Sequence, residues 1–329
     1  MEEKSKLSFI RKFFNSYTNT PIQKIEEKFF EQKNISLYIK RDDLFHPFIN
    51  GNKWFKLKYN LFEAAEKNFN QLLTFGGAYS NHISAFSYAC KIFGFEGIVV
   101  VRGEEYKKLN PTLEFVSGNR IKLHYISRQM YRNKYDESFL LKLKKQYGDY
   151  FLIPEGGSNL LAVKGCSEII SNIEINFDFI FTACGTAGTL TGIAESLKEN
   201  QKAIGIAVLK NGRFLIDEVK RLSQNKNLNF KIFFDYHFGG YAKFNSSLLE
   251  FIRDFYQKHQ IILEPIYTGK LLFAVYDLIY KNYFPPNSKL VVYHSGGLQG
   301  YYGLKKFNSI NNLYESFNWR EYEKQIVNK

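Results

Sequence analysis

Lys53 is the residue whose type and setting best suit covalent chemistry, because it follows a tight polar turn of sequence Asn-Gly-Asn at residues 50–52. A lysine that enters a pocket from such a turn is desolvated, and desolvation or nearby positive charge lowers its pKa. The free amine is then a nucleophile toward an aldehyde. Since the chain holds 45 Lys and Arg residues, an ordinary solvated lysine is the simpler alternative for this turn taken alone.

A second polar segment, residues 74–82, places Tyr79, Ser80, Asn81 and His82 after a pair of glycines. Glycines let a backbone approach a ligand closely, and Ser80 or Asn81 can cap the helix that follows. An amide and a hydroxyl at a helix N-terminus suit a ring oxygen or a carboxylate. A helix cap without a ligand is the alternative interpretation.

A third segment follows an apolar run and consists of small residues and hydroxyls, namely Gly185, Thr186, Ala187, Gly188 and Thr189. Free N–H groups at such a turn, with a helix dipole behind them, form a phosphate cradle. The spacing does not fit the dinucleotide pattern G-x-G-x-x-G, and no segment fits the pattern G-x-x-x-x-G-K-[ST] of nucleotide triphosphate sites. The sequence therefore predicts a phosphate site of another kind.

A fourth group lies near the C-terminus, where Tyr267 and Thr268 belong to the stretch EPIYTGK and Ser295 belongs to HSGG. In isolation, a packed aromatic residue and a structural histidine at His294 are the simpler interpretations of these stretches.

The elements that must position these residues are short apolar strands alternating with amphipathic helices. We expect strands at residues 36–40, 71–75, 97–101, 122–126, 178–182, 203–209 and 289–293. We expect helices around 83–93, 187–198 and 246–259. Near-continuous apolar strands are typical of parallel sheets buried on both faces. Alternation with helices indicates an α/β fold, in which ligands bind beyond the carboxyl ends of the strands.

Composition limits the classes of protein that remain. The chain has 329 residues, 45% of them hydrophobic and 23% charged, as in a globular protein of two domains or one large α/β unit. Residues 1–12 are charged, so we expect no secretory signal, and no apolar run reaches the length of a membrane span. Three scattered cysteines predict no disulfide framework, and together these features favour the cytoplasm.

The formal net charge of +13 raises the alternative of a basic nucleic-acid-binding protein. The lysines are spread along the chain, however, and no recognised binding motif accompanies them, so we expect no nucleic-acid partner. A basic surface equally suits small anionic substrates. The histidines are scattered, with no i, i+4 pair beside a carboxylate, and we therefore expect no metal site.

Taken together and in chain order, the segments resemble the family of 1-aminocyclopropane-1-carboxylate deaminase and D-cysteine desulfhydrase, which are fold-type II pyridoxal-phosphate enzymes. The resemblance spans roughly residues 20 to 305. It is carried by KRDDL (40–44), GNK (51–53), SNH (80–82), EGGSN (155–159), GTAGT (185–189), EPIYTGK (264–270) and HSGG (294–297).

The resemblance implies two open, twisted, mostly parallel sheets with flanking helices. It also implies a larger domain (residues 1–57 and 164–329), a smaller inserted α/β domain (58–163) and a homodimer. Lys53 is expected to carry pyridoxal 5'-phosphate as a Schiff base, Asn81 to bind the ring hydroxyl, and residues 185–189 to hold the phosphate. Ser80, Tyr267 and Tyr241 are expected to be catalytic.

Thr268 favours one reaction over the other. The deaminases typically place a glutamate at this position, where it pairs with the pyridine nitrogen and strengthens the electron sink. A hydroxyl at Thr268, with Ser295 close by, favours a neutral ring. We therefore expect elimination from a small amino acid, D-cysteine first, to give pyruvate, ammonia and sulfide. Ring opening of the cyclopropane acid is the alternative.

The sequence departs from the family near the expected substrate carboxylate. Tyr79 replaces a frequent glutamine, and residues 83–85 (Ile-Ser-Ala) replace a stretch that contains arginine and glutamine. With Ser80, Asn81 and His82, Tyr79 is expected to contact substrate. The departures leave another fold-type II lyase or racemase open, and a catalytically silent binding protein is an alternative that retention of Lys53 disfavours.

Overall fold

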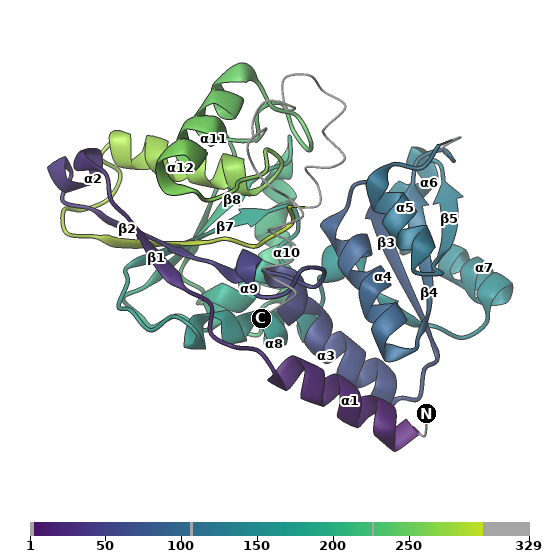
Figure 1. Cartoon of the computed structure of the whole chain (residues 1–329). Coiled ribbons are helices and arrows are strands. Elements are labelled where there is room, and N and C mark those ends of the chain that lie inside the picture. Colours follow the sequence, from purple (N-terminus) through teal and green to yellow (C-terminus); the bar gives the residue numbers. More distant parts are fainter. Residues whose placement is uncertain (1–2, 106–107, 226, 299–329) are drawn as a thin grey trace.

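Two β-sheets organise the computed structural model, which describes residues 3–105, 108–225 and 227–298 (Figure 1). Six strands form the first sheet in the order β1-β2-β10-β7-β8-β9, and four form the second in the order β5-β4-β3-β6. Neighbouring strands are parallel throughout, except that β1 runs antiparallel to β2. The prediction of an α/β fold with mostly parallel sheets is confirmed.

The first sheet consists of β1 (Ile22–Ile25), β2 (Ser36–Lys40), β7 (Phe179–Cys184), β8 (Lys202–Ala207), β9 (Phe230–Phe233) and β10 (Lys289–Tyr293). The second consists of β3 (Gln71–Gly77), β4 (Glu96–Arg102), β5 (Lys122–Ile126) and β6 (Phe151–Ile153). The α-helices are α1 (Glu3–Asn15), α2 (Lys28–Gln32), α3 (Asn52–Glu66), α4 (Asn81–Phe93), α5 (Pro111–Gly118), α6 (Arg128–Arg132), α7 (Glu137–Tyr147), α8 (Leu160–Ser171), α9 (Gly188–Glu195), α10 (Leu215–Leu222), α11 (Ser246–His259) and α12 (Thr268–Tyr280). Short 3-10 helices are η1 (Asp42–Leu44), η2 (Glu155–Gly157) and η3 (Gly212–Phe214).

Alternate residues of each strand enter different hydrophobic cores, because successive side chains of a strand point to opposite faces. In β10, Val291 belongs to the core under α3, α8 and α9, whereas Val292 belongs to the core under α11 and α12. In β4, Val99 joins the first of these cores and Val100 joins a third core with residues of α6 and α7. Helices therefore cover both faces of both sheets, which explains why central strands such as β3, β4 and β7 are nearly continuous apolar runs.

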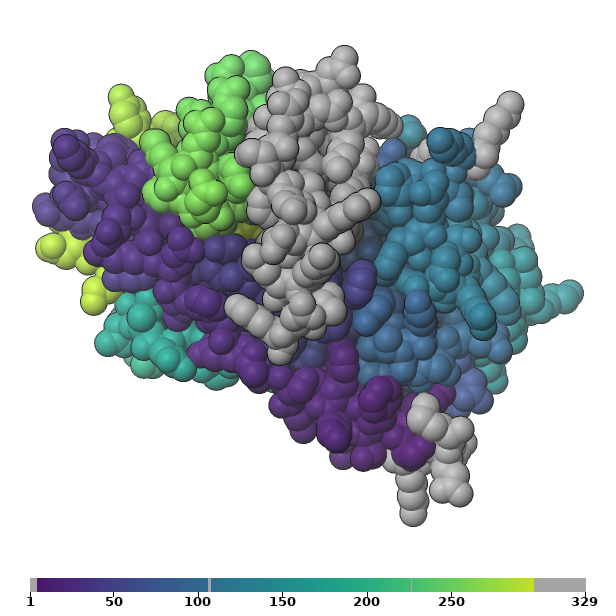
Figure 2. All heavy atoms as spheres, in the orientation of Figure 1, coloured from purple at the N-terminus to yellow at the C-terminus, as the bar shows by residue number. Residues whose placement is uncertain are grey.

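The N-terminal helix α1 packs on α3 and α4 through aromatic residues. The ring of Phe14 lies 4.6 Å from that of Trp54, and the ring of Phe13 lies 5.1 Å from that of Phe93. Figure 2 shows the side chains of α1, in purple, lying against the blue segment of the chain, which includes α4. This packing fixes the first turns of α3, where Lys53 lies.

The seven predicted strands all occur, with ends that differ by up to two residues. The predicted strand 203–209 ends at Ala207, and the predicted helix 187–198 ends at Glu195. The sequence analysis missed β1, β6 and β9, which have only three or four residues each.

The strands of the second sheet all fall inside the predicted inserted segment 58–163, and those of the first sheet all fall outside it. The two predicted boundaries lie within helices, since α3 contains residues 57 and 58 and α8 contains residues 163 and 164. These two helices pack against each other, so the sheets are linked by packed helices and not by a loop. The exact boundaries remain a prediction.

Within the described ranges, no helix combines the length and apolar character needed to cross a membrane. The same ranges contain no group of three or more His, Cys, Asp or Glu residues suited to hold a metal ion.

Candidate active site

A cavity of about 940 Å³ lies at the carboxyl ends of strands from both sheets. Gly77 and Arg102 end β3 and β4 of the second sheet, while Gly185 and Ser295 follow β7 and β10 of the first. Segments far apart in sequence thus meet where open α/β sheets bind ligands. The predicted site residues that line the cavity are Lys53, Ser80, Asn81, His82, Gly185, Thr186, Ala187, Thr189, Tyr241, Tyr267 and Ser295.

Lys53 lies in the first turn of α3, directly after a turn that requires glycine. Gly51 has a φ of +53°, and a Cβ atom there would lie 2.0 Å from the carbonyl oxygen of Ser295. Lys53 Nζ donates a hydrogen bond to Asn52 Oδ1 (3.1 Å). Burial lowers the pKa of Lys53 well below its ordinary value, and the ammonium of Lys56 lowers it further. A lowered pKa favours the unprotonated amine that a nucleophile requires, and the role of Lys53 as that nucleophile remains a prediction.

Lys56 lies one turn after Lys53 on the same helix, and its ammonium joins the two sides of the cavity. Lys56 Nζ donates hydrogen bonds of 3.0 Å to the carbonyl oxygen of Gly156 and to the hydroxyl oxygens of Ser158 and Thr186. Sequence reasoning missed Lys56, although residues three apart on a helix share a face. The spacing from Lys53 was the signal that could have found it.

The segment 185–189 reaches α9 at Gly188, so its N–H groups face the positive end of that helix. A Cβ atom on Gly188 would lie 2.9 Å from Ser158 Oγ, which explains why this position is a glycine. An ammonium, two hydroxyls and a helix N-terminus form a donor set that fits a phosphate dianion. With the amine of Lys53 in the same cavity, these residues fit pyridoxal phosphate.

Ser80 caps α4, since its Oγ accepts a hydrogen bond from the N–H of His82 (3.2 Å). Asn81 lies beside the loop after β10, where a Cβ atom on Gly297 would be 1.9 Å from Asn81 Nδ2. The loop can approach Asn81 this closely only because residue 297 is a glycine. Ser80 and Asn81 therefore lie together on the cavity wall.

The protonation of His82 follows from its neighbours. The Thr74 hydroxyl donates its one proton to the carbonyl oxygen of Ile153 (2.7 Å), so it must accept from His82 Nε2 (2.8 Å). Burial and the ammonium groups of Lys53 and Lys56 lower the pKa of His82 well below its ordinary value. His82 is thus neutral with its proton on Nε2, and Nδ1 is a buried acceptor with no hydrogen-bond partner among the described residues.

Tyr241 and Tyr267 form an aromatic pair on the cavity wall, with ring centroids 6.0 Å apart. Burial raises the pKa of Tyr241, and burial together with the neighbouring Tyr241 raises that of Tyr267 well above its ordinary value. Both hydroxyls are therefore protonated near neutral pH and can donate protons or hydrogen bonds.

Glu264, which sequence reasoning quoted but gave no role, holds the turn that presents Tyr267. Its buried carboxylate accepts hydrogen bonds from the N–H groups of Ile266 (2.7 Å), Tyr267 (2.8 Å) and Thr268 (2.7 Å). A glutamate three residues before an aromatic position, at the start of a helix, was the signal in the sequence.

Thr268, Tyr79 and Gly188 are the predicted site residues that do not line the cavity. The Thr268 hydroxyl is buried, accepts a hydrogen bond from the Glu264 N–H (2.9 Å) and lies 3.2 Å from the Glu264 carboxylate. The Tyr79 ring packs against the core that contains α3 and α4. Of the two hydroxyls expected beside the cofactor ring, only that of Ser295 belongs to a residue that lines the cavity.

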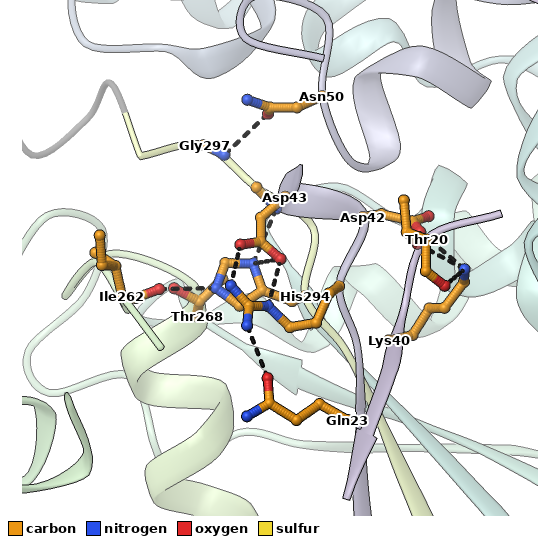
Figure 3. A network of polar contacts seen from close by, with 12 residues as sticks. Thr20, Gln23, Lys40, Asp42, Asp43, Asn50, Ile262, Thr268, His294 and Gly297 are labelled. Atoms are coloured by element: carbon orange, nitrogen blue, oxygen red, sulfur yellow. Dashed lines mark hydrogen bonds and ion pairs between the residues drawn. The ribbon is translucent and has the colours of Figure 1, made fainter. Parts of the chain in front are cut away.

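The KRDDL stretch supports the site from outside the cavity (Figure 3). Asp43 forms two hydrogen bonds with Arg41 (2.9 and 2.8 Å), and Asn50 Oδ1 accepts the N–H of Gly297 (3.2 Å). His294 Nε2 donates to the carbonyl oxygen of Ile262 (2.8 Å), and burial lowers its pKa, so this histidine is neutral and structural. These contacts join the loop before Lys53 to the loop that carries Ser295.

Comparison with known proteins agrees with this geometry. A family model described as pyridoxal-phosphate dependent enzyme matches residues 14–296. A Pyrococcus furiosus protein provisionally named 1-aminocyclopropane-1-carboxylate deaminase is 33% identical over 289 residues, covering 82% of this chain and 87% of the relative. An Arabidopsis thaliana protein is named bifunctional D-cysteine desulfhydrase/1-aminocyclopropane-1-carboxylate deaminase, mitochondrial. It is 30% identical over 300 residues, which cover 81% of this chain and 73% of the relative.

Solved structures show the same relationship. The crystal structure of an ACC deaminase homologue matches with a TM-score of 0.75 at 28% identity, covering 92% of this chain and 98% of its own. Serine racemase from Dictyostelium discoideum has a TM-score of 0.60 at 18% identity, over 89% of this chain and 97% of its own, and thus shares the fold. The chain therefore belongs to the family of pyridoxal-phosphate-dependent enzymes that includes 1-aminocyclopropane-1-carboxylate deaminase and D-cysteine desulfhydrase, and pyridoxal phosphate is its cofactor.

Proposed function

We propose that this enzyme eliminates sulfide from D-cysteine and, with the consumption of one water molecule, gives pyruvate, ammonia and hydrogen sulfide. The observation that supports this reaction best is the chemistry of the cavity lining, to which Tyr267 and Ser295 contribute hydroxyls. The only described acidic residues that line the cavity, Glu155 and Glu218, each pair with a basic side chain. Without a carboxylate partner the pyridine ring stays neutral, which suffices for loss of a proton and a good leaving group.

The residues have separate tasks in this reaction. Lys53 holds the cofactor, and its amine, with a lowered pKa, is a base suited to take the Cα proton of D-cysteine. When bound, pyridoxal phosphate supplies an electron sink for the bond that breaks at Cα. The Cβ–S bond then breaks with its electron pair on sulfur, and the thiolate takes a proton to leave as hydrogen sulfide. Tyr241 and Tyr267, held protonated by burial, are the proton donors on the wall.

The phosphate end of the cofactor would be held by Lys56, Ser158, Thr186 and the N-terminus of α9, and Asn81 would contact the ring hydroxyl. Ser80 and the beginning of α4 would bind the substrate carboxylate, because a helix N-terminus favours anions. His82 contributes a neutral acceptor to the same wall.

Ring opening of 1-aminocyclopropane-1-carboxylate is the second candidate, because relatives from Pyrococcus furiosus and Arabidopsis thaliana carry that activity in their names. This substrate has no Cα proton, so Lys53 would have to act at another atom. A homodimer, as the family resemblance implies, is part of the proposal; light scattering of the purified protein measures it.

The test compares Lys53→Ala with Lys58→Ala in the presence of pyridoxal phosphate. Lys58 lies on the same helix but pairs with Glu168 (2.7 Å) and does not line the cavity. We expect wild type and Lys58→Ala to show the visible cofactor band and to release sulfide from D-cysteine, and Lys53→Ala to do neither. Release of 2-oxobutyrate from the cyclopropane acid without any sulfide from D-cysteine would replace elimination by ring opening.

A further inference from the structure

The charged side chains that line the cavity are mostly paired with one another. Lys134 Nζ lies 3.2 Å from Glu155 Oε2, and Arg221 Nη2 lies 2.7 Å from Glu218 Oε2. The basic residues that remain on the wall are Lys53, which holds the cofactor, and Arg102. Within the described part of the chain, Arg102 forms no ion pair. Its charge is therefore available to a ligand in the cavity.

Arg102 lies next to the loop that carries Ser80 and Asn81. It ends β4 and is in register with Gly77 of β3, and a Cβ atom on Gly77 would lie 3.7 Å from Arg102 Nη2. The carbonyl oxygen of Gly77 accepts the N–H of Ser80 (3.0 Å). The guanidinium is thus close to Gly77, the residue whose carbonyl oxygen binds the N–H of Ser80 in the predicted substrate-binding loop.

Arg102 interacts with two tyrosines, Tyr131 through a cation-π contact and Tyr241 through its charge. Its guanidinium carbon lies 5.7 Å from the ring centroid of Tyr131, which is buried, and this contact orients the cation without neutralising it. Burial raises the pKa of Tyr241, but the charge of Arg102 acts on the same hydroxyl in the opposite direction. The charge of Arg102 therefore acts at Tyr241, which lines the cavity.

We infer that Arg102 receives negative charge on the side chain of the substrate and thereby determines which amino acids this enzyme prefers. The inference rests on the proposed function. The substrate carboxylate already has the N-terminus of α4, so the guanidinium is left for a second anionic group, for which its planar fork is suited. In D-cysteine this group is the sulfur, which becomes a thiolate as the Cβ–S bond breaks.

The test measures binding of two amino acids that cannot eliminate, D-alanine and D-aspartate, by titrating the visible spectrum of the holoenzyme. The variants are Arg102→Gln, Arg102→Lys and, as a control, Lys134→Gln. The control removes the same unit of charge from the same cavity, but from a lysine paired with Glu155. It thus separates a specific contact from a general change in charge.

We expect wild type to bind D-aspartate at least about tenfold more tightly than D-alanine, since a charge-assisted hydrogen bond to a guanidinium is strong. We expect Arg102→Gln to lose this preference while its affinity for D-alanine stays unchanged. Arg102→Lys should keep part of the preference, and the control Lys134→Gln should keep most of it. Equal weakening of both ligands, no weakening of either, or the same loss in Lys134→Gln would overturn the inference. If neither amino acid changes the wild-type spectrum, the inference fails, whereas the proposed function is decided separately by the release of sulfide from D-cysteine.

Discussion

The ammonium nitrogen of Lys56 lies 3.0 Å from the hydroxyl oxygen of Thr186, which joins the helix of Lys53 to the segment that precedes α9. Lys56 is buried, and its other two hydrogen bonds go to Gly156 and Ser158. This cation therefore has two roles: it supplies positive charge where the phosphate would bind, and it lowers the pKa of Lys53 by electrostatic repulsion.

Replacing Lys56 by methionine tests both roles. We expect affinity for pyridoxal phosphate to fall at least about tenfold, because a charged hydrogen-bond donor is lost. Without the second ammonium, the pKa of Lys53 should rise toward its ordinary value. The rate at which apoenzyme captures the cofactor grows as Lys53 loses its proton, so its pH profile should shift to higher pH. An unchanged affinity and pH profile would show that Lys56 acts in neither way.

The tautomer of His82 gives a second prediction, which histidine nitrogen NMR of apoenzyme checks. In wild type we expect Nδ1 of His82 to have the nitrogen chemical shift of an unprotonated nitrogen and Nε2 to have that of a protonated nitrogen. The signals of His82 are those that are missing in His82→Gln. Thr74→Val removes the acceptor of the Nε2 proton and should mix the two tautomers. A protonated Nδ1 in wild type would contradict the hydrogen-bond chain through Thr74 and Ile153.

Sequence alone predicted the parallel sheets because their strands are buried on both faces and are therefore apolar at nearly every position. It identified Lys53, Asn81 and the 185–189 segment because their motifs occur in the order of the family that the chain resembles. Small residues and polar turns mark where a backbone can approach a ligand, but alone they leave a solvated lysine or a helix cap as the alternative. It missed Lys56 because only the spacing of three residues from Lys53 distinguishes this lysine from the many others in the chain. It also assigned Thr268 to the ring, since the direction of a side chain at the beginning of α12 depends on Glu264, a tertiary hydrogen-bond partner.

Gly51 provides a prediction about stability. Gly51→Ala should lower the free energy of unfolding by at least about 2 kcal/mol, because the residue has positive φ and its Cβ would meet the Ser295 carbonyl. Gly118→Ala is the matched control, since its Cβ would enter open space at the end of α5. We expect the control to change stability by less than about 1 kcal/mol. Urea denaturation measures both, and equal effects would contradict the close approach at residue 51.

His46 makes stability depend on pH in the mildly acidic range. Burial lowers its pKa to about 4 in the folded protein, from 6.5 in the unfolded chain, and Nδ1 accepts the N–H groups of Phe48 and Ile49. Between these values the unfolded chain binds a proton that the folded protein does not, so stability is full above pH 6.5 and falls as the pH approaches 4. The loss should be at most about 3 kcal/mol.

His46→Asn keeps a hydrogen-bond acceptor but does not titrate, so it isolates this effect. The difference in unfolding free energy between wild type and variant should narrow or reverse as the pH falls from 6.5 to 4. A difference that stays constant over this range would show that His46 titrates normally in the folded protein.

The attachment of the cofactor to Lys53 is tested most directly by reducing the purified holoenzyme with borohydride and locating the pyridoxyl group by fragment mass spectrometry. We expect the label on Lys53, with Lys56, three residues later, unmodified. A label on Lys56 or on a lysine outside the cavity, with Lys53 unmodified, would contradict this attachment.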